Sequence, residues 1–127
     1  MVKGVLLDSV VLIDHLNGIQ ASADYLASLH RNSTPVWISA ITRAEVLAGT
    51  KSHYEFGLIS RLLAEFEFAP LSSEVADSAA ELRRTLRLRL PDAFQLACAL
   101  NLDLKLATRN TRDFSENDPR IEVPYTL

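Results

Sequence analysis

This 127-residue sequence has one cysteine, few glycines and no long hydrophobic run. A single thiol forms no internal disulfide, and Cys98 lies in an apolar stretch, so we predict that it packs in the interior. The apolar runs are far shorter than the ~18 residues that a membrane-spanning helix requires. Residues 1–20 also lack the pattern of a secretory signal. We therefore expect one cytoplasmic domain over residues 1–127, with no membrane partner.

The scarcity of glycine and histidine disfavours several enzyme classes. The four glycines are too scattered for the dinucleotide-binding loop or the P-loop. The three histidines are too far apart for a local zinc motif such as His-Glu-x-x-His. A phosphatase that forms an aspartyl-phosphate would have a similar first strand, but its second acid is replaced here by Val10.

Positive charge is also limited. Thirteen basic and sixteen acidic residues give a net charge of −3, which argues against indiscriminate binding of nucleic acid. One local group of arginines stands out: Arg83, Arg84, Arg87 and Arg89. The i, i+4 spacing predicts that Arg83 and Arg87 share one helix face. By itself this group has the simple interpretation of a solvated helix surface.

Strand-like and helix-like segments alternate along the chain. Short apolar or β-branched runs predict strands at residues 5–7, 36–39, 67–71, 104–107 and 121–123. Helices are predicted at residues 9–16, 21–30, 42–48, 53–66, 73–88 and 91–100. Strands that alternate with helices form a parallel sheet covered on both faces by right-handed crossovers. We therefore expect an α/β fold.

Four acidic residues follow the predicted strands or lie in the helices after them: Asp8, Glu45, Asp92 and Asp113. In a parallel sheet these positions share one edge, where ligands usually bind. Carboxylates held together raise one another's pKa unless a cation compensates them, so the group predicts a magnesium or manganese site. Such a metal can activate water for attack on a phosphodiester.

Each acid also has a purely structural interpretation. Asp8 can cap the helix that follows it, and Thr42 with Glu45 fits a capping box. Asp92 can complement the dipole of its helix, and residues 110–113 can form an Asx-type turn. It is the joint arrangement of the acids, rather than any one of them, that favours a metal site.

Four segments around these acids share a family pattern. They are Leu7-Asp8-Ser9, Ala44-Glu45-Val46, Leu90-Pro91-Asp92-Ala93, and Thr108-Arg109-Asn110 with Asp113-Phe114. In this order they resemble the motifs of PIN-domain ribonucleases, and most closely those of the VapC toxins of bacterial and archaeal toxin–antitoxin pairs. The resemblance spans nearly the whole chain.

The resemblance implies a three-layer α/β/α sandwich with a central parallel sheet, and a magnesium- or manganese-dependent endoribonuclease site. Asp8, Asp92 and Asp113 match the acids that hold the metal directly or through water. Glu45 matches the acid that completes the pocket and orients or deprotonates the water. These matches predict the role of each acid.

Polar neighbours of the acids are expected to support the metal ligands; they are Ser9, Thr108 and Asn110. One position departs from the family pattern, in which Asp-Thr is followed by Asn or Ser. Here Asp8-Ser9 is followed by Val10, which cannot hydrogen-bond water or substrate, although Ser9 can compensate in part. The alternative to an active nuclease is therefore a weak or inactive PIN-fold binding module that acts through its antitoxin partner and dimer interface.

The resemblance also implies partners. Family members generally form homodimers and are silenced by a VapB-type antitoxin, which also supplies the DNA contact when the pair represses its operon. Beside an acidic metal site, arginines can hold RNA phosphates through charge-assisted hydrogen bonds. We therefore predict RNA binding by Arg83, Arg84, Arg87 and Arg89.

Overall fold

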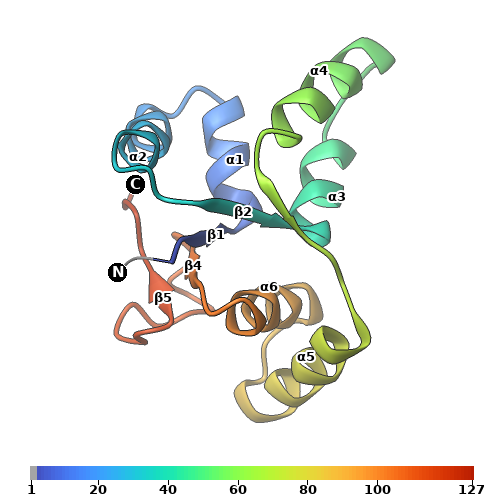
Figure 1. The fold of residues 1–127 in the computed structure, drawn as a ribbon, viewed down its shortest axis with the longest axis vertical. Coiled ribbons are helices and arrows are strands. Elements are labelled where there is room, and N and C mark those ends of the chain that lie inside the picture. Colours follow the sequence, from blue (N-terminus) through green and yellow to red (C-terminus); the bar gives the residue numbers. More distant parts are fainter. Residues whose placement is uncertain (1–2) are drawn as a thin grey trace.

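A parallel sheet of five strands forms the centre of the fold in the computed structural model, which describes residues 3–127 (Figure 1). The strands are β1 (Val5–Leu7), β2 (Val36–Ser39), β3 (Glu67–Ala69), β4 (Lys105–Ala107) and β5 (Ile121–Glu122). They lie in the order β3-β2-β1-β4-β5, and all neighbouring pairs are parallel. The predicted sheet is confirmed.

Helices cover both faces of this sheet and complete the three expected layers (Figure 1). One face carries α1 (Ser9–Leu16), α2 (Gln20–Arg31), α3 (Ala40–Ala48) and α4 (His53–Leu63). The other carries α5 (Ser73–Leu86) and α6 (Leu90–Asn101). Leu6 points into the core beside α6, whereas Val5 and Leu7 point into the opposite core, as the alternation of a strand requires. The predicted elements are present, with ends shifted by up to three residues.

The start of α3 differs from the capping box considered for Thr42 and Glu45. Ser39 caps this helix by accepting a hydrogen bond from the backbone N–H of Thr42. The Thr42 hydroxyl instead donates to the carbonyl of Leu7 at 3.1 Å, and Glu45 accepts a hydrogen bond from Ser9. The capping box, which was the structural alternative for Glu45, is not formed, because the Thr42 and Glu45 side chains turn toward the junction of β1 and α1.

The junction between α5 and α6 corrects the prediction that Arg83 and Arg87 share one helix face. α5 ends before Arg87, which has a left-handed backbone with φ of 58°. Arg83 and Arg87 therefore do not share a helix face. Arg83 donates to the carbonyl of Leu88 at 2.6 Å and so braces the turn. Arg89 is the N-cap residue of α6, the helix that carries Asp92.

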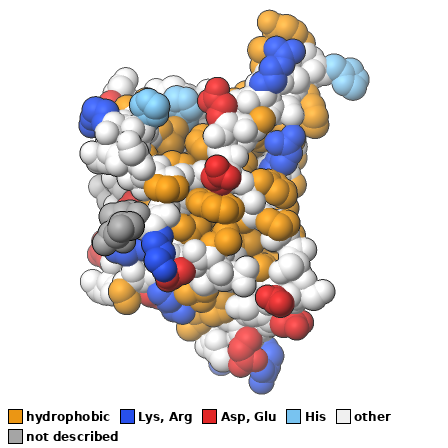
Figure 2. Space-filling model, in the orientation of Figure 1, with side chains coloured by type: hydrophobic (Ala, Val, Ile, Leu, Met, Phe, Trp, Pro, Cys, Tyr) orange, Lys and Arg blue, Asp and Glu red, His pale blue; other side chains and the backbone are white. Residues whose placement is uncertain are grey.

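Most apolar residues lie in the two cores. Cys98 is 1% exposed, and burial raises the pKa of its thiol to about 11, which confirms the predicted packing role. Some apolar side chains stay exposed, among them Phe56 of α4 and Phe68 of β3. Figure 2 shows hydrophobic side chains gathered over the middle of one face of the molecule, between the two helical layers. Within residues 3–127, no helix has the length and apolar character needed to cross a membrane.

A buried carboxylate joins three distant segments of the chain. Asp14 of α1 accepts hydrogen bonds from Nε and Nη2 of Arg109 at 2.6 and 3.0 Å. It also accepts one from the hydroxyl of Tyr125 at 2.8 Å. The hydrogen bonds from Arg109 hold the pKa of Asp14 below its usual value. Asp14 therefore ties the loop after β4 and the C-terminal segment to α1.

Replacing this carboxylate should destabilise the fold. We expect Asp14→Asn to lower the free energy of unfolding by about 2 kcal/mol, because it leaves the Arg109 guanidinium without its charged partner. Urea unfolding measures the change. The matched control is Asp24→Asn, at an exposed position of α2, which should change stability by less than about 0.5 kcal/mol.

The effect of Asp14→Asn should also depend on pH. The folded-state pKa of Asp14 lies below its unfolded value of 3.8, so the ionised carboxylate stabilises the fold above that pH. This stabilisation is lost as the pH falls through the lower, folded-state pKa. The difference in stability between the two proteins should be constant above about pH 5 and shrink in more acidic solution. A difference that stays constant down to about pH 2 would contradict this role.

Candidate active site

Asp8 lies where the strand order of the sheet reverses. In the sheet, β2 and then β3 lie on one side of β1, and β4 and then β5 lie on its other side. In open α/β sheets the crevice beyond the strand ends at such a reversal is the usual ligand site. Asp8 comes directly after β1 and Thr108 directly after β4. The backbone N–H of Asp8 donates to the carbonyl of Ala107 at 2.9 Å, which holds these two strand ends together.

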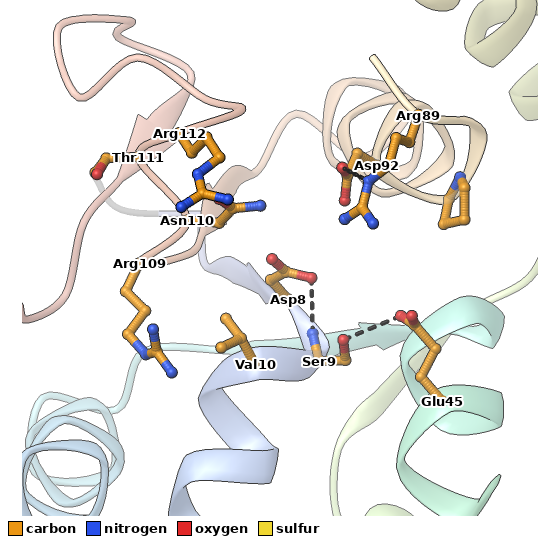
Figure 3. A pocket seen from close by; sticks show the side chains of 11 residues that line it. Asp8, Ser9, Val10, Glu45, Arg89, Asp92, Arg109, Asn110, Thr111 and Arg112 are labelled. Atoms are coloured by element: carbon orange, nitrogen blue, oxygen red, sulfur yellow. Dashed lines mark hydrogen bonds and ion pairs between the residues drawn. The ribbon is translucent and has the colours of Figure 1, made fainter. Parts of the chain in front are cut away.

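A cavity of about 440 Å³ opens at this edge and gathers residues from several elements (Figure 3). Of the residues predicted for the site, it is lined by Asp8, Ser9, Glu45, Arg89, Asp92 and Asn110. They come from the start of α1, from α3, from the start of α6 and from the loop after β4. Val10 also lines the cavity, and its apolar side chain offers no hydrogen bond there. The sheet thus brings together residues that are far apart in the sequence.

Asp8 is held by polar groups although it is only 7% exposed. Its Oδ2 accepts a hydrogen bond from the Thr108 hydroxyl at 2.7 Å, and its Oδ1 accepts one from the backbone N–H of Ser9 at 2.8 Å. Burial raises the pKa of Asp8, and the charges of Asp92 and Glu45 raise it further, against the opposing hydrogen bond from Thr108. Asp8 therefore both caps α1 and presents a carboxylate that a cation would stabilise.

A buried polar network beneath Asp8 was missed by the sequence analysis. Gln95 of α6 is 1% exposed, accepts a hydrogen bond from Ser39 at 2.6 Å and donates to Thr42 at 2.7 Å. Its amide nitrogen also lies 3.4 Å from Oδ1 of Asp8. The available signal was a single amide in the apolar part of α6, one helical turn after Asp92. This network does not line the cavity but reaches it through the contact of Gln95 with Asp8.

Asp92 forms part of another wall and contacts an arginine. It is 6% exposed and lies in the first turn of α6. Nε of Arg89 donates to Oδ2 of Asp92 at 3.2 Å, and Nη2 of Arg89 lies 3.8 Å from Oδ2 of Asp113. Burial raises the pKa of Asp92, while Arg89 opposes this shift and Asp113 adds to it. Asp92 is thus a second buried carboxylate with incomplete charge compensation.

The loop after β4 carries the remaining predicted residues. Thr108 is fully buried, and its hydroxyl oxygen also accepts the backbone N–H of Asn110 at 3.0 Å. The side-chain amide of Asn110 donates to Asp113 at 2.8 Å. Neither Thr108 nor Asp113 is among the residues that line the cavity. Thr108 contacts the site through its hydrogen bond to Asp8. Asp113 contacts two lining residues, Asn110 and Arg89.

The donor set at the cavity fits a hard divalent cation. Within residues 3–127, no three histidine, cysteine or acidic side chains lie close enough to form a ready ligand group. Asp8 and Asp92 nevertheless present two buried carboxylates to the cavity, with Glu45 nearby. Mg²⁺ commonly keeps several waters and takes only one or two protein carboxylates. A cation would also compensate the charges whose burial raises the two pKa values.

The arginines at the cavity differ in part from the predicted group. That group is Arg83, Arg84, Arg87 and Arg89. Of these four, the lining includes Arg89 alone, together with Arg109 and Arg112 from the loop after β4. In Figure 3, Arg89 and Arg112 extend from opposite walls, while Arg109 points toward α1. Arg109 and Arg112 were overlooked although they lie between Thr108 and Asp113, inside a motif that the sequence analysis had singled out.

Comparison with known sequences agrees with this architecture. A family model described as PIN domain matches residues 5–118. The ribonuclease VapC10 of Mycobacterium tuberculosis is 36% identical over 115 residues, which cover 87% of this chain and 85% of that protein. The similarity thus extends over most of both chains.

Comparison with solved structures extends the similarity to the whole fold. A chain of a toxin–antitoxin complex from Klebsiella pneumoniae superposes with a TM-score of 0.88 at 33% identity, over 98% of this chain and 100% of that chain. A chain of FitAB bound to an IR36 DNA fragment gives a TM-score of 0.76 at 25% identity, over 97% and 96% of the two chains. Together, the family match over residues 5–118 and the long alignment to VapC10 show that this chain belongs to the PIN-domain family.

Proposed function

We propose that this protein is a metal-dependent endoribonuclease and the toxin of a type II toxin–antitoxin pair. The observation that carries the proposal is the pair of buried carboxylates, Asp8 and Asp92, which face one cavity at the strand reversal of the sheet. The similarity to a protein named ribonuclease VapC10 supports RNA as the substrate class. The reaction would be hydrolysis of an RNA phosphodiester bond by water.

Asp8 and Asp92 would hold Mg²⁺ or Mn²⁺ directly, and Asp113 would act through water. A bound metal supplies positive charge that lowers the pKa of water and stabilises charge on the phosphate oxygens. Glu45 also lines the cavity, and its carboxylate accepts a hydrogen bond from Ser9 at 3.0 Å. This contact places Glu45 to orient the attacking water and accept its proton.

The residues around these acids would keep them in place. Thr108 and the backbone of Ser9 hold Asp8 from two sides, and Gln95 supports it from below. Asn110 positions Asp113 through the hydrogen bond between their side chains. Hydrogen-bonded neighbours of this kind keep the metal ligands in the orientation that metal binding and the reaction require.

RNA phosphates would be bound by the arginines at the mouth of the cavity. Arg89 and Arg112 extend from opposite walls, so a backbone that crosses the cavity can contact both (Figure 3). We propose that the remaining members of the predicted group, Arg83, Arg84 and Arg87, continue the phosphate contacts beyond the cavity. Their contribution would be electrostatic and salt-dependent.

We further propose a homodimer and a VapB-type antitoxin as partners in the cytoplasm. A structure with 33% sequence identity is a toxin–antitoxin complex, and one with 25% identity is bound to a DNA fragment. The apolar side chains that this chain leaves exposed are suited to protein contacts. Because the chain carries a net charge of −3, we expect DNA contact to come through the antitoxin.

Cleavage of RNA tests the proposed activity. Purified protein freed of antitoxin should cut a mixed cellular RNA pool with Mn²⁺ or Mg²⁺ and should stop in chelator. Asp8→Asn, Asp92→Asn and Glu45→Gln should each lower the rate by about 100-fold or more. Asp24→Asn removes an exposed acid on α2 and should cut normally. Cutting that persists in chelator would refute metal dependence.

A catalytically weak binding module is the second candidate, and Val10 is the observation that favours it. Its apolar side chain lines the cavity at a position where the family usually has a hydrogen-bonding residue. If the folded wild-type protein binds Mn²⁺ but does not cut RNA, Val10→Ser and Val10→Asn should be compared with it. Cutting gained by either variant would identify the missing side chain as the cause.

Metal binding can be tested without activity. In metal-free protein, Asp8→Asn should not lower the melting temperature. It removes a buried charge at an unchanged volume, so the free energy of unfolding should stay the same or rise by up to about 1 kcal/mol. Mn²⁺ in large excess over its Kd should stabilise the wild type by about 2 kcal/mol and should leave Asp8→Asn unchanged. Equal stabilisation of both proteins would show that Asp8 does not hold the metal.

A further inference from the structure

We propose that Arg89 is a built-in counter-ion, which occupies the cation position between Asp92 and Asp113 in metal-free protein and moves to an RNA phosphate when metal binds. This inference rests on the proposed metal-dependent nuclease and concerns how its site is switched on. It gives Arg89 two successive partners, of which the sequence pattern predicts only the second, an RNA phosphate.

The contacts of Arg89 are the first reason. One guanidinium group reaches both acids, with Nε 3.2 Å from Asp92 and Nη2 3.8 Å from Asp113. These two acids are among those that the family resemblance assigns to the metal. A cation that binds Asp92 through Oδ2 would compete with Arg89 for that oxygen, and one that binds through Oδ1 would still share the carboxylate with the guanidinium group.

The second reason is that Arg89 is held loosely. Its side chain is 73% exposed, and the ion-pair distances are long for charged partners. Only the Arg89 end of the pair with Asp92 is open to solvent, and water competes there for the guanidinium group and weakens the pair. Arg109 offers a direct contrast, because its side chain is 32% exposed and makes two short hydrogen bonds to Asp14. Arg109 is thus a fixed structural cation, whereas Arg89 is free to leave its partners.

Charge balance gives the third reason. Asp8, Glu45, Asp92 and Asp113 all interact at or beside the cavity. A divalent metal and a guanidinium group repel when both contact the same carboxylate. Metal binding at Asp92 therefore weakens the ion pair between Asp92 and Arg89. By linkage, the presence of Arg89 lowers the affinity for the metal.

A phosphate is the natural second partner for the displaced guanidinium. Arg89 lines the cavity and faces Arg112 across it (Figure 3). The planar guanidinium group binds phosphate oxygens through paired hydrogen bonds. The exchange would leave Asp92 and Asp113 with a cation at each stage, with Arg89 as partial compensation before metal binds and the metal afterwards. RNA affinity would then be highest when the metal is bound.

Metal affinity provides the first test. Isothermal titration with Mn²⁺ should show about fivefold tighter binding to Arg89→Gln than to the wild type at low salt. The matched control is Arg31→Gln, which makes the same charge change at the end of α2, before β2 begins and at the opposite edge of the sheet. Its Mn²⁺ affinity should stay within about twofold of the wild type, because Arg31 is not among the charges that act on Asp8 or Asp92.

RNA affinity provides the second test, in a Glu45→Gln background that stops cleavage. Fluorescence anisotropy with a labelled single-stranded RNA of mixed sequence should show about tenfold weaker binding after Arg89→Gln when Mn²⁺ is present. With chelator the loss should be smaller, because Arg89 is then engaged with the acids. Arg89→Lys should keep the Mn²⁺ affinity near wild type and restore part of the RNA binding. A merely structural role would weaken metal and RNA binding together.

The outcomes separate this inference from the proposed function. Mn²⁺ affinity for Arg89→Gln that equals or falls below wild type would overturn the exchange. So would an RNA affinity that falls equally with metal and with chelator. If wild type and Asp8→Asn bind Mn²⁺ equally, the metal site itself is wrong, whatever Arg89 does. Tighter metal binding with metal-dependent loss of RNA affinity is the combined result expected.

Discussion

The central physical constraint at this site is that the Asp8 carboxylate must stay charged while it is almost completely buried. Burial raises its pKa, and neighbouring acids raise it further. The protein offsets part of this cost with neutral donors, which are the Thr108 hydroxyl and the backbone N–H of Ser9. Neutral donors orient the carboxylate without cancelling its charge. The remaining negative charge is what a cation would compensate in the proposed metal site.

The rest of the architecture serves to hold these groups at one edge of the sheet. Pairing of β1 with β4 brings Thr108 to Asp8, and α6 brings Asp92 and Gln95 to the same place. Apolar side chains on alternate faces of β1 lock it between two cores. Because β1 is buried on both faces, the carboxylate at its end has little freedom to move away from its donors.

Two arginines near the site differ in how they contact their acids. Arg109 makes short hydrogen bonds to Asp14, within a network that also includes Tyr125. Arg89 is far more exposed and spans two acids at longer distances. Both residues are arginines beside an acid, so their chemistry is the same. The exposure of the side chain and the length of its contacts separate the two residues, and they are the basis for proposing that Arg89 exchanges partners.

The sequence by itself determined the fold class, the order of strands and helices along the chain, and the place of the four acids after strands or in the helices that follow. These features are local: apolar runs, helical spacing, and an acid directly after a strand. The PIN-domain resemblance was also readable from short motifs, and the family match over residues 5–118 confirmed it.

Only the tertiary structure decided which polar groups meet. Thr108 and Asp8 are 100 residues apart, and Ser39 and Gln95 are 56 apart, so no local pattern reports their hydrogen bonds. Local spacing allowed a capping box for Glu45 as an alternative, yet its side chain turns to Ser9 because β1 and β2 are neighbours. Local spacing determines secondary structure, whereas the order of strands in the sheet determines which distant side chains share a cavity.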